Sequence, residues 1–230
     1  DTTTVLMGFT ITSGAGNFKL SGFPEFLYWR VGGGIDISAG GARILRNKVV
    51  SNAASSVRSA SGGINVWDAT NSGQVGIVIV ESNVIADNDA LGGVGYGGGI
   101  GLAAGYTIVR NNIITRNYAS SRAGGIDAAA GSSAIVNNTI VNNKARGGIQ
   151  GVFTGASSVP RLLNNILWNP GDNIEFVGAV DVAHNNLMRG GSFVASNTSV
   201  EPSFTDTTTY ALSAASPGIS AGEDSMVIRS

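Results

Sequence analysis

The 230-residue sequence has no cysteine, five prolines and one histidine. Without cysteine there are no disulfides, no thiol catalysis and no Cys-ligated metal sites. Thirty-four glycines beside so few prolines do not fit a collagen or a proline-rich linker. Charged residues make up only 13% of the chain and the formal net charge is −1, so no basic field exists to attract nucleic acid. We therefore expect no nucleic-acid partner.

The chain also has no candidate transmembrane segment. The uncharged run Ala90–Val109 is as long as a membrane span, but it contains eight glycines, too many for a spanning helix. No signal peptide is recognisable, and Asp1 lies directly before a strand-like phrase. This start is typical of a processed or trimmed chain.

The most informative feature is a repeat. An aliphatic residue, two variable positions, an asparagine, one variable position and a second aliphatic residue recur six times. The aligned asparagines are Asn47, Asn83, Asn112, Asn138, Asn165 and Asn186, with gaps of 36, 29, 26, 27 and 21 residues. In four copies another asparagine follows five positions later, at Asn52, Asn88, Asn117 and Asn143.

A second phrase, Gly-Gly-Ile, alternates with the first. Its isoleucines are Ile35, Ile64, Ile100, Ile126 and Ile149, with a degenerate copy at Asn173 and Ile174. Each unit therefore consists of a strand, a polar turn, a strand, a variable loop and a glycine-marked strand. No helical periodicity is present.

These repeats predict an all-β fold, a right-handed parallel β-helix of roughly seven to nine coils. Stacking coils ~4.8 Å apart places aliphatic side chains on one another, whereas a single coil cannot bury them. Asparagine at a turn tolerates the left-handed region and offers both a donor and an acceptor, so the six aligned asparagines are expected to form a structural ladder. A propeller would need evenly spaced blades of about 40 residues. We expect one domain over residues 1–230, with an aromatic loop insertion at 18–30 and a closing segment at 200–230.

The alternating phrases resemble those of right-handed β-helix proteins of the pectin-lyase-like superfamily. They are also similar to the repeats of polymorphic outer-membrane proteins. The opening TTVLMGFTI at 3–11 and the ending from Glu201 to Gly222 are similar to the first and last phrases of such domains. The resemblance implies an extracellular or cell-surface, bacterial protein. The superfamily includes polysaccharide lyases, glycosidases and uronate epimerases, so it also raises an enzymatic alternative.

Candidate catalytic groups are sparse. A glycosidase needs two carboxylates about 5–9.5 Å apart, and a lyase needs a base with a cation. The position after each Gly-Gly-Ile phrase reads Asp36, Asn65, Gly101, Asp127, Gln150 and Glu175, which separates the acids. Asp87 and Asp89 lie in one loop without a third acid, and the single His184 lies in the weakest repeat. We therefore assign no catalytic residue, metal or cofactor.

Two features favour binding instead. The insertion holds Phe18, Phe23, Phe26, Tyr28 and Trp29, which offer flat faces for sugar rings if exposed and cover the first coils if not. Arg58, Tyr96, Arg122 and Arg146 each precede a Gly-Gly-Ile isoleucine by three to six residues. Aligned on successive coils they would bind an acidic glycan, since arginine pairs with carboxylates. Otherwise they are solvated side chains.

The sequence thus predicts a non-catalytic extracellular or cell-surface solenoid with a structural, adhesive or glycan-binding role. One alternative is a lyase or glycosidase that acts on an acidic glycan. Another is a subunit of a filament or sheath, because uncapped solenoid ends invite stacking. The expected partners are accordingly a polysaccharide or neighbouring copies of the chain.

Overall fold

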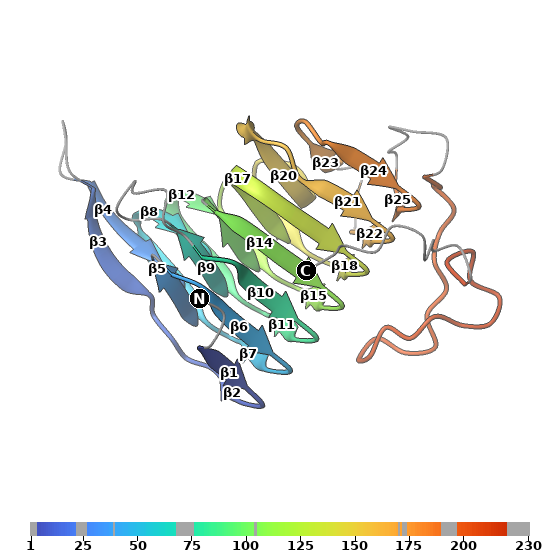
Figure 1. Ribbon diagram of the computed structural model, residues 1–230, viewed down its shortest axis with the longest axis horizontal. Helices are drawn as coiled ribbons and strands as arrows, with labels where there is room; N and C mark the ends of the chain where they lie inside the picture. Colours follow the sequence, from blue (N-terminus) through green and yellow to red (C-terminus); the bar gives the residue numbers. More distant parts are fainter. Residues whose placement is uncertain are drawn as a thin grey trace.

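The computed structural model describes residues 4–21, 27–38, 40–67, 76–103, 105–169, 171, 174–189 and 197–219. Within these ranges the regular structure is all β, in three sheets whose strands stack side by side along the long axis (Figure 1). The strands pair in parallel, except for the antiparallel pair β3–β4. This confirms the predicted all-β, parallel class. No helix in the described part of the chain has the length and apolarity needed to cross a bilayer.

The largest sheet has 12 strands in two rows joined by the long strand β17. The first row is β1 (Val5–Met7), β6 (Ala42–Leu45), β10 (Val78–Glu81), β14 (Tyr106–Arg110), β17 (Ile126–Val136), β21 (Arg161–Leu163) and β24 (Val182–His184). The second row is β5 (Ile35–Ser38), β9 (Ile64–Trp67), β13 (Ile100–Leu102), β17, β20 (Ile149–Ser158) and β23 (Ile174–Val177).

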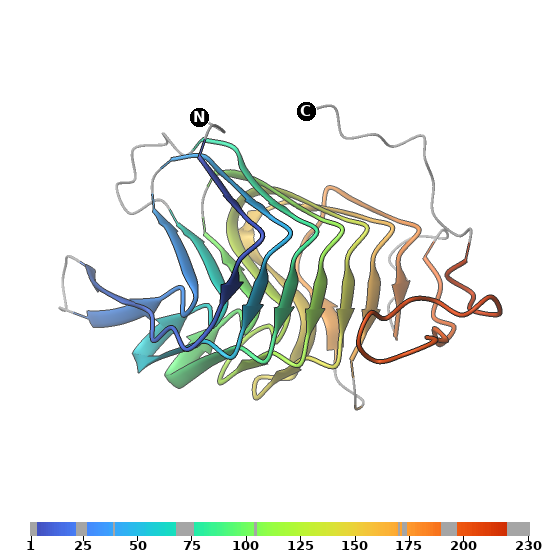
Figure 2. The same cartoon turned by 90° about the horizontal axis from the view of Figure 1, so that it is seen from below.

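The other two sheets complete each passage of the chain. The seven-stranded sheet is β2 (Thr10–Ile11), β7 (Lys48–Val50), β11 (Val84–Ala86), β15 (Ile113–Thr115), β18 (Thr139–Val141), β22 (Ile166–Trp168) and β25 (Leu187–Met188). The six-stranded sheet is β3 (Asn17–Ser21), β4 (Leu27–Val31), β8 (Ala53–Ala60), β12 (Asp89–Tyr96), β16 (Tyr118–Ala119) and β19 (Lys144–Ala145). We call one passage through these sheets a circuit; Figure 2 shows the circuits in succession.

Aliphatic side chains at equivalent positions form the core. One column contains Ile44, Val80, Val109, Ile135 and Leu162, and another contains Val49, Ile85, Ile114, Ile140, Leu167 and Met188. All of these residues are buried. Because each side chain packs on its counterparts in the circuits before and after it, the core is continuous along the stack, as expected for a solenoid.

The six predicted ladder asparagines do bond to one another. The backbone N–H and side-chain amide of each donate to Oδ1 of the next, over 2.8–3.2 Å, and the series continues to Asn197. The left-handed residue, however, is the one before each asparagine, such as Arg46 (φ 53°) or Asn111 (φ 57°). The asparagines are therefore selected by their side-chain hydrogen bonds, and the strained turn position accepts several residue types.

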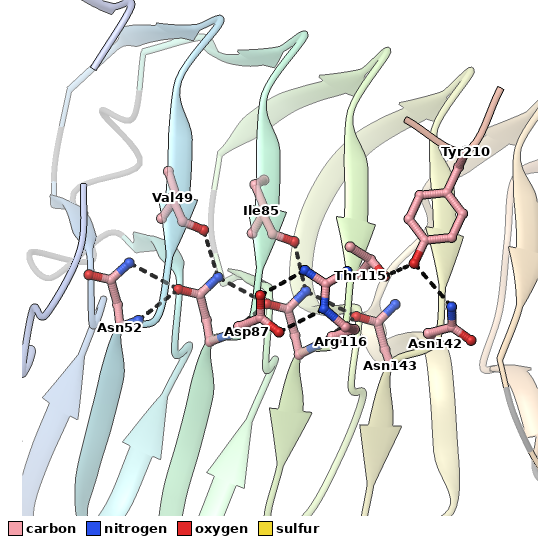
Figure 3. Close-up of polar contacts among 11 residues, drawn as sticks. Val49, Asn52, Ile85, Asp87, Thr115, Arg116, Asn142, Asn143 and Tyr210 are labelled. Carbon is pink, nitrogen blue, oxygen red and sulfur yellow. Dashed lines mark hydrogen bonds and ion pairs between the residues drawn. The ribbon is translucent and has the colours of Figure 1, made fainter. Parts of the chain in front are cut away.

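A second ladder runs parallel to the first through Asn52, Asn88, Asn117 and Asn143 (Figure 3). It extends further than the five-residue spacing predicts, because Asn169 follows Asn165 by four positions and accepts from Asn143. The donor chain ends on Glu175, whose carboxylate accepts the backbone and side-chain N–H groups of Asn169 at 2.7 and 2.5 Å. A carboxylate only accepts hydrogen bonds, which makes it a suitable last member.

The glycine-marked phrase shifts register once. Ile126 pairs with Val152, and not with Ile149 as the spacing of Gly-Gly-Ile predicts. The column of Asp36, Asn65, Gly101 and Asp127 therefore continues with Phe153, so Gln150 and Glu175 do not belong to it. Gln150 instead accepts a hydrogen bond from the backbone of Ala145.

Two segments depart from the circuits. The described residues of the predicted loop insertion at 18–30 belong to two antiparallel strands, β3 and β4, and β4 joins β8 in parallel. The described part of the closing segment, 200–219, returns along the seven-stranded sheet (Figure 2). There the Tyr210 hydroxyl lies 2.9 Å from Thr115 Oγ1 and accepts from Asn142 Nδ2 at 3.1 Å (Figure 3).

Candidate functional site

A cleft of about 260 Å³ opens where the six-stranded sheet meets the row of β5, β9, β13 and β17. Its lining comprises Trp29, Ala60, Ser61, Asn65, Trp67, Tyr96, Gly101, Leu102, Ala103, Arg122, Asp127 and Ala129. One residue per circuit with positive φ turns the chain at this corner: Gly32 (56°), Ser61 (63°), Gly97 (60°) and Ala123 (41°). Small residues such as Gly101, Ala103 and Ala129 leave the space that the larger side chains surround.

Three aromatic side chains from three strands border the cleft. The ring centroids of Trp29 and Tyr96 lie 6.0 Å apart at an interplanar angle of 31°, and those of Trp29 and Trp67 lie 6.4 Å apart at 35°. All three side chains are half-buried. The Arg58 guanidinium lies 5.6 Å from the Trp29 ring, so a cation flanks this group. Parallel register fixes the relative positions of Trp29 and Tyr96, because β4, β8 and β12 are successive neighbours in one sheet, whereas Trp67 lies on β9 in the adjoining row.

Beside the aromatic side chains lies a buried ion pair. Arg122 donates to Asp127 through Nε at 2.9 Å and Nη2 at 3.3 Å. The guanidinium is held between rings, 4.2 Å from the centroid of Tyr96 and 4.3 Å from that of Phe153. The Asp127 side chain is 3% exposed and that of Arg122 is 33% exposed. Burial raises the pKa of Asp127, and the charge and hydrogen bonds of Arg122 partly oppose that rise.

The other polar groups of the cleft come from the circuits that precede Gly101, and together with Arg122 and Asp127 we call them the polar wall. Asn65 Nδ2 donates to Asp36 Oδ1 at 2.8 Å. The Ser61 hydroxyl occupies the place where a side chain of Gly101 would lie, 2.0 Å from an added Cβ. Both Asn65 and Ser61 are buried. Glycine at position 101 therefore lets Ser61 pack beneath the cleft.

The structure brings together half of the predicted binding residues. Trp29, Tyr96, Arg58 and Arg122 were predicted as parts of two separate features, and they lie around one cleft. Phe23 and Phe26 lie outside the described residues, as does the side chain of Tyr28.

The predicted row of basic and aromatic residues does not form as a whole. Arg58 pairs with Trp29 and Val94, so it is two positions out of line with Tyr96. Arg146 is exposed, and its N–H bonds to Ala119, which places it out of register with Arg122. Only Tyr96 and Arg122 pair directly across adjacent circuits.

Sequence reasoning missed Trp67 and the role of Asp127. Trp67 is the last residue of the strand that begins at Ile64. Its equivalents in the neighbouring circuits are Ser38 and Ala103, so no repeated motif marks this position. Asp127 belongs to the column of residues that follow the Gly-Gly-Ile phrases, but that column reveals only neighbouring acids and not an arginine partner. An arginine five residues before an aspartate, across the glycine turn, was the available signal.

The acids singled out by the sequence, as far as the structure describes them, do not pair with one another at the separation that glycosidases use. Asp36 and Asp127 lie on strands three spacings apart, ~14 Å, which exceeds the separation that glycosidases use. Asp87 accepts two hydrogen bonds of 2.8 Å from Arg116 of the next circuit (Figure 3). The pKa of Asp89 is raised, mainly by burial and secondarily by the negative charge of Asp87. No cluster of three metal-ligating side chains occurs among the described residues. His184 lies in β24, outside the cleft lining.

Comparison with known proteins gives no match, whether to a protein-family model, to a curated protein or to a solved structure.

Proposed function

We propose that this chain is a right-handed parallel β-helix of the extracellular or cell-surface type that binds a glycan in the aromatic cleft without transforming it. The observation that carries the proposal is the meeting of Trp29, Trp67 and Tyr96, from three strands, beside a polar wall. Indole and phenol rings offer flat apolar faces, and a pyranose ring offers a face of C–H groups that packs on them. The polar wall supplies hydrogen-bonding groups for sugar hydroxyls.

The size of the cleft supports a ligand of one ring or slightly more. Its volume of about 260 Å³ lies just below the ~300–1,000 Å³ of typical small-molecule pockets. The lining spans strands β9, β13 and β17, so a longer oligosaccharide would continue along the stacking axis. A ligand chain that extends across circuits suits a repeat architecture, whose equivalent positions lie in line.

The scaffold favours binding without large rearrangement. Trp67 and Asp127 lie on strands paired on both sides, and the ladders hold the circuits in register. Sites on rigid elements lose little conformational entropy on binding. The enzymatic alternative would use an aspartate such as Asp127 as the base and Arg122 as the cation, but the two hydrogen bonds from Arg122 already engage the carboxylate.

The test is a glycan-array screen of the purified chain with parallel detection of unsaturated and reducing ends. Trp67→Ala should weaken binding by about two- to tenfold through lost stacking, with a further loss from the apolar area no longer buried, since stacking on one aromatic side chain contributes about 0.5–1.5 kcal/mol beyond buried area. Tyr106→Ala is the matched control, because Tyr106 is an exposed aromatic residue outside the cleft. The proposal is supported if glycan binds without any product being formed, and if Trp67→Ala weakens this binding while Tyr106→Ala leaves it unchanged.

Two outcomes contradict it. Products that disappear in Asp127→Asn would establish an enzyme. Aromatic grooves also dock proline-rich peptides, so a peptide panel is screened beside the array. Peptide binding with a silent glycan array would replace the glycan with a protein partner.

A further inference from the structure

The charges that line the cleft cancel. Among its lining residues the charged side chains are Arg122 and Asp127, and these two are paired with each other. As an ion pair, these two side chains give the cleft no net charge. A site built for a carboxylate-bearing sugar would instead direct an uncompensated guanidinium at the ligand. From this we infer that the cleft selects an uncharged glycan over an acidic one, an inference that rests on the proposed function.

Arg122 keeps hydrogen-bonding capacity although its charge is balanced. A guanidinium has five N–H donors, and two of the five are used on Asp127. The side chain is 33% exposed, so remaining donors can reach a ligand. Stacking between the rings of Tyr96 and Phe153 fixes the plane of the group. A fixed, neutralised donor set suits hydroxyl and ring oxygens.

An acidic sugar would lose the hydration of its carboxylate without gaining a net opposite charge. On entering the cleft the carboxylate would give up its bonds to water, and the Arg122–Asp127 pair, whose charges cancel, offers no net attraction in return. An anion in a site that excludes water therefore binds less tightly than its uncharged ester. Arg58 stands near Trp29 but does not line the cleft, and Asp36, which accepts a hydrogen bond from the lining residue Asn65, brings a charge of opposite sign to the same region.

The experiment compares one oligosaccharide in two charge states. A hexuronic-acid oligosaccharide and its methyl ester share a skeleton and differ in the carboxylate charge. Their dissociation constants are measured by calorimetry at low salt for the wild type, for Asp127→Asn and for Asp87→Asn. Asp87→Asn is the matched control: it makes the same change in net charge and releases an arginine, Arg116, away from the cleft.

The ratio of the two affinities is the readout. In the wild type the ester should bind about tenfold more tightly than the free acid. Asp127→Asn, which releases the charge of Arg122 inside the cleft, should remove or reverse that preference, and Asp87→Asn should leave it. Equal affinity of acid and ester in the wild type, or equal ratios in the two variants, would overturn the inference and leave glycan binding standing. No binding of ester, acid or any neutral glycan by the folded protein would overturn the proposed function as well.

Discussion

Replacing Asn112 with alanine tests the ladder at its centre. Asn112 is 1% exposed and takes part in side-chain hydrogen bonds with both neighbouring circuits. Its Oδ1 accepts from the backbone N–H and Nδ2 of Asn83, at 2.9 and 3.0 Å. Its Nδ2 donates to the Val80 carbonyl at 2.9 Å and to Asn138 Oδ1 at 3.0 Å. Alanine removes all four bonds and leaves buried partners without them.

The magnitude follows from these partners. A net contribution of about 0.5–1.5 kcal/mol per hydrogen bond gives ~2–6 kcal/mol for four, and each buried group left unsatisfied costs about 1–3 kcal/mol in desolvation. These two figures overlap, because the second describes the same loss at the unsatisfied partner. We therefore expect Asn112→Ala to lower the free energy of unfolding by about 4 kcal/mol. That is a large fraction of the ~5–15 kcal/mol typical of folded domains.

Equilibrium unfolding in urea measures the change, with the slope of the transition compared between variants. Asn111→Gly is the matched control, because Asn111 is the adjacent exposed residue with φ 57°, a backbone conformation that glycine adopts readily. It should change stability by less than about 0.5 kcal/mol. If Asn112→Ala were no more destabilising than Asn111→Gly, the ladder would be a consequence of the stacking and not a support for it.

Two further predictions concern single groups. Burial raises the pKa of Glu175, so the Glu175 carboxyl binds a proton more tightly in the folded chain than in the unfolded chain. The stability gained from this protonation is complete below the ordinary glutamate pKa of about 4.3 and is lost as the pH rises through the raised pKa. The unfolding free energy of wild type should therefore fall relative to that of Glu175→Gln with rising pH in urea titrations, and a constant difference would contradict this. Tyr210→Phe removes two hydrogen bonds, a loss of about 1–3 kcal/mol, and should speed proteolytic cleavage within 197–219. Unchanged cleavage would mean that the hydroxyl does not anchor the segment.

The repeating part of the fold was predictable because each circuit repeats one physical requirement. A buried asparagine that must reach its counterpart recurs with the same aliphatic neighbours, as at Asn83 and Asn112. Loops between repeats vary in length without changing that requirement, so gaps of 36 and 21 residues both appear in one ladder.

Register across the glycine turns was harder to predict. Ile149 follows two glycines like its counterparts, yet Val152 takes the equivalent position because the strand pairs three residues later. The glycines of these turns pack backbone against backbone, as where a Cβ on Gly33 would lie 1.9 Å from the Gly62 carbonyl oxygen. A pair of glycines indicates that two backbones lie close together, but it does not indicate which residues of the two strands pair. Asn169 was missed for a related reason, a turn shortened by one residue.

The cleft could be predicted only in fragments. Trp29 and Tyr96 are 67 positions apart, and the register of β4, β8 and β12 is what places their rings 6.0 Å apart. Trp67 has no aromatic equivalent in the neighbouring circuits, so a search for columns could not find it. The ion pair required knowing that the turn between Arg122 and Asp127 folds the two side chains together.

The cleft lies where the repeat is broken, and the buried charge of Asp127 is the clearest case. The equivalent positions hold Asn65, Gly101 and Phe153, which satisfy the stack without an ion, whereas Asp36, the other acid of the column, is only half-buried. Burying a carboxylate costs several kcal/mol, and its partner offsets that cost only in part, so a neutral residue at 127 would serve stability at least as well. Selection for folding alone would favour that neutral residue. We propose that a charge kept beside a partly exposed arginine and three aromatic side chains serves the ligand proposed above for the cleft.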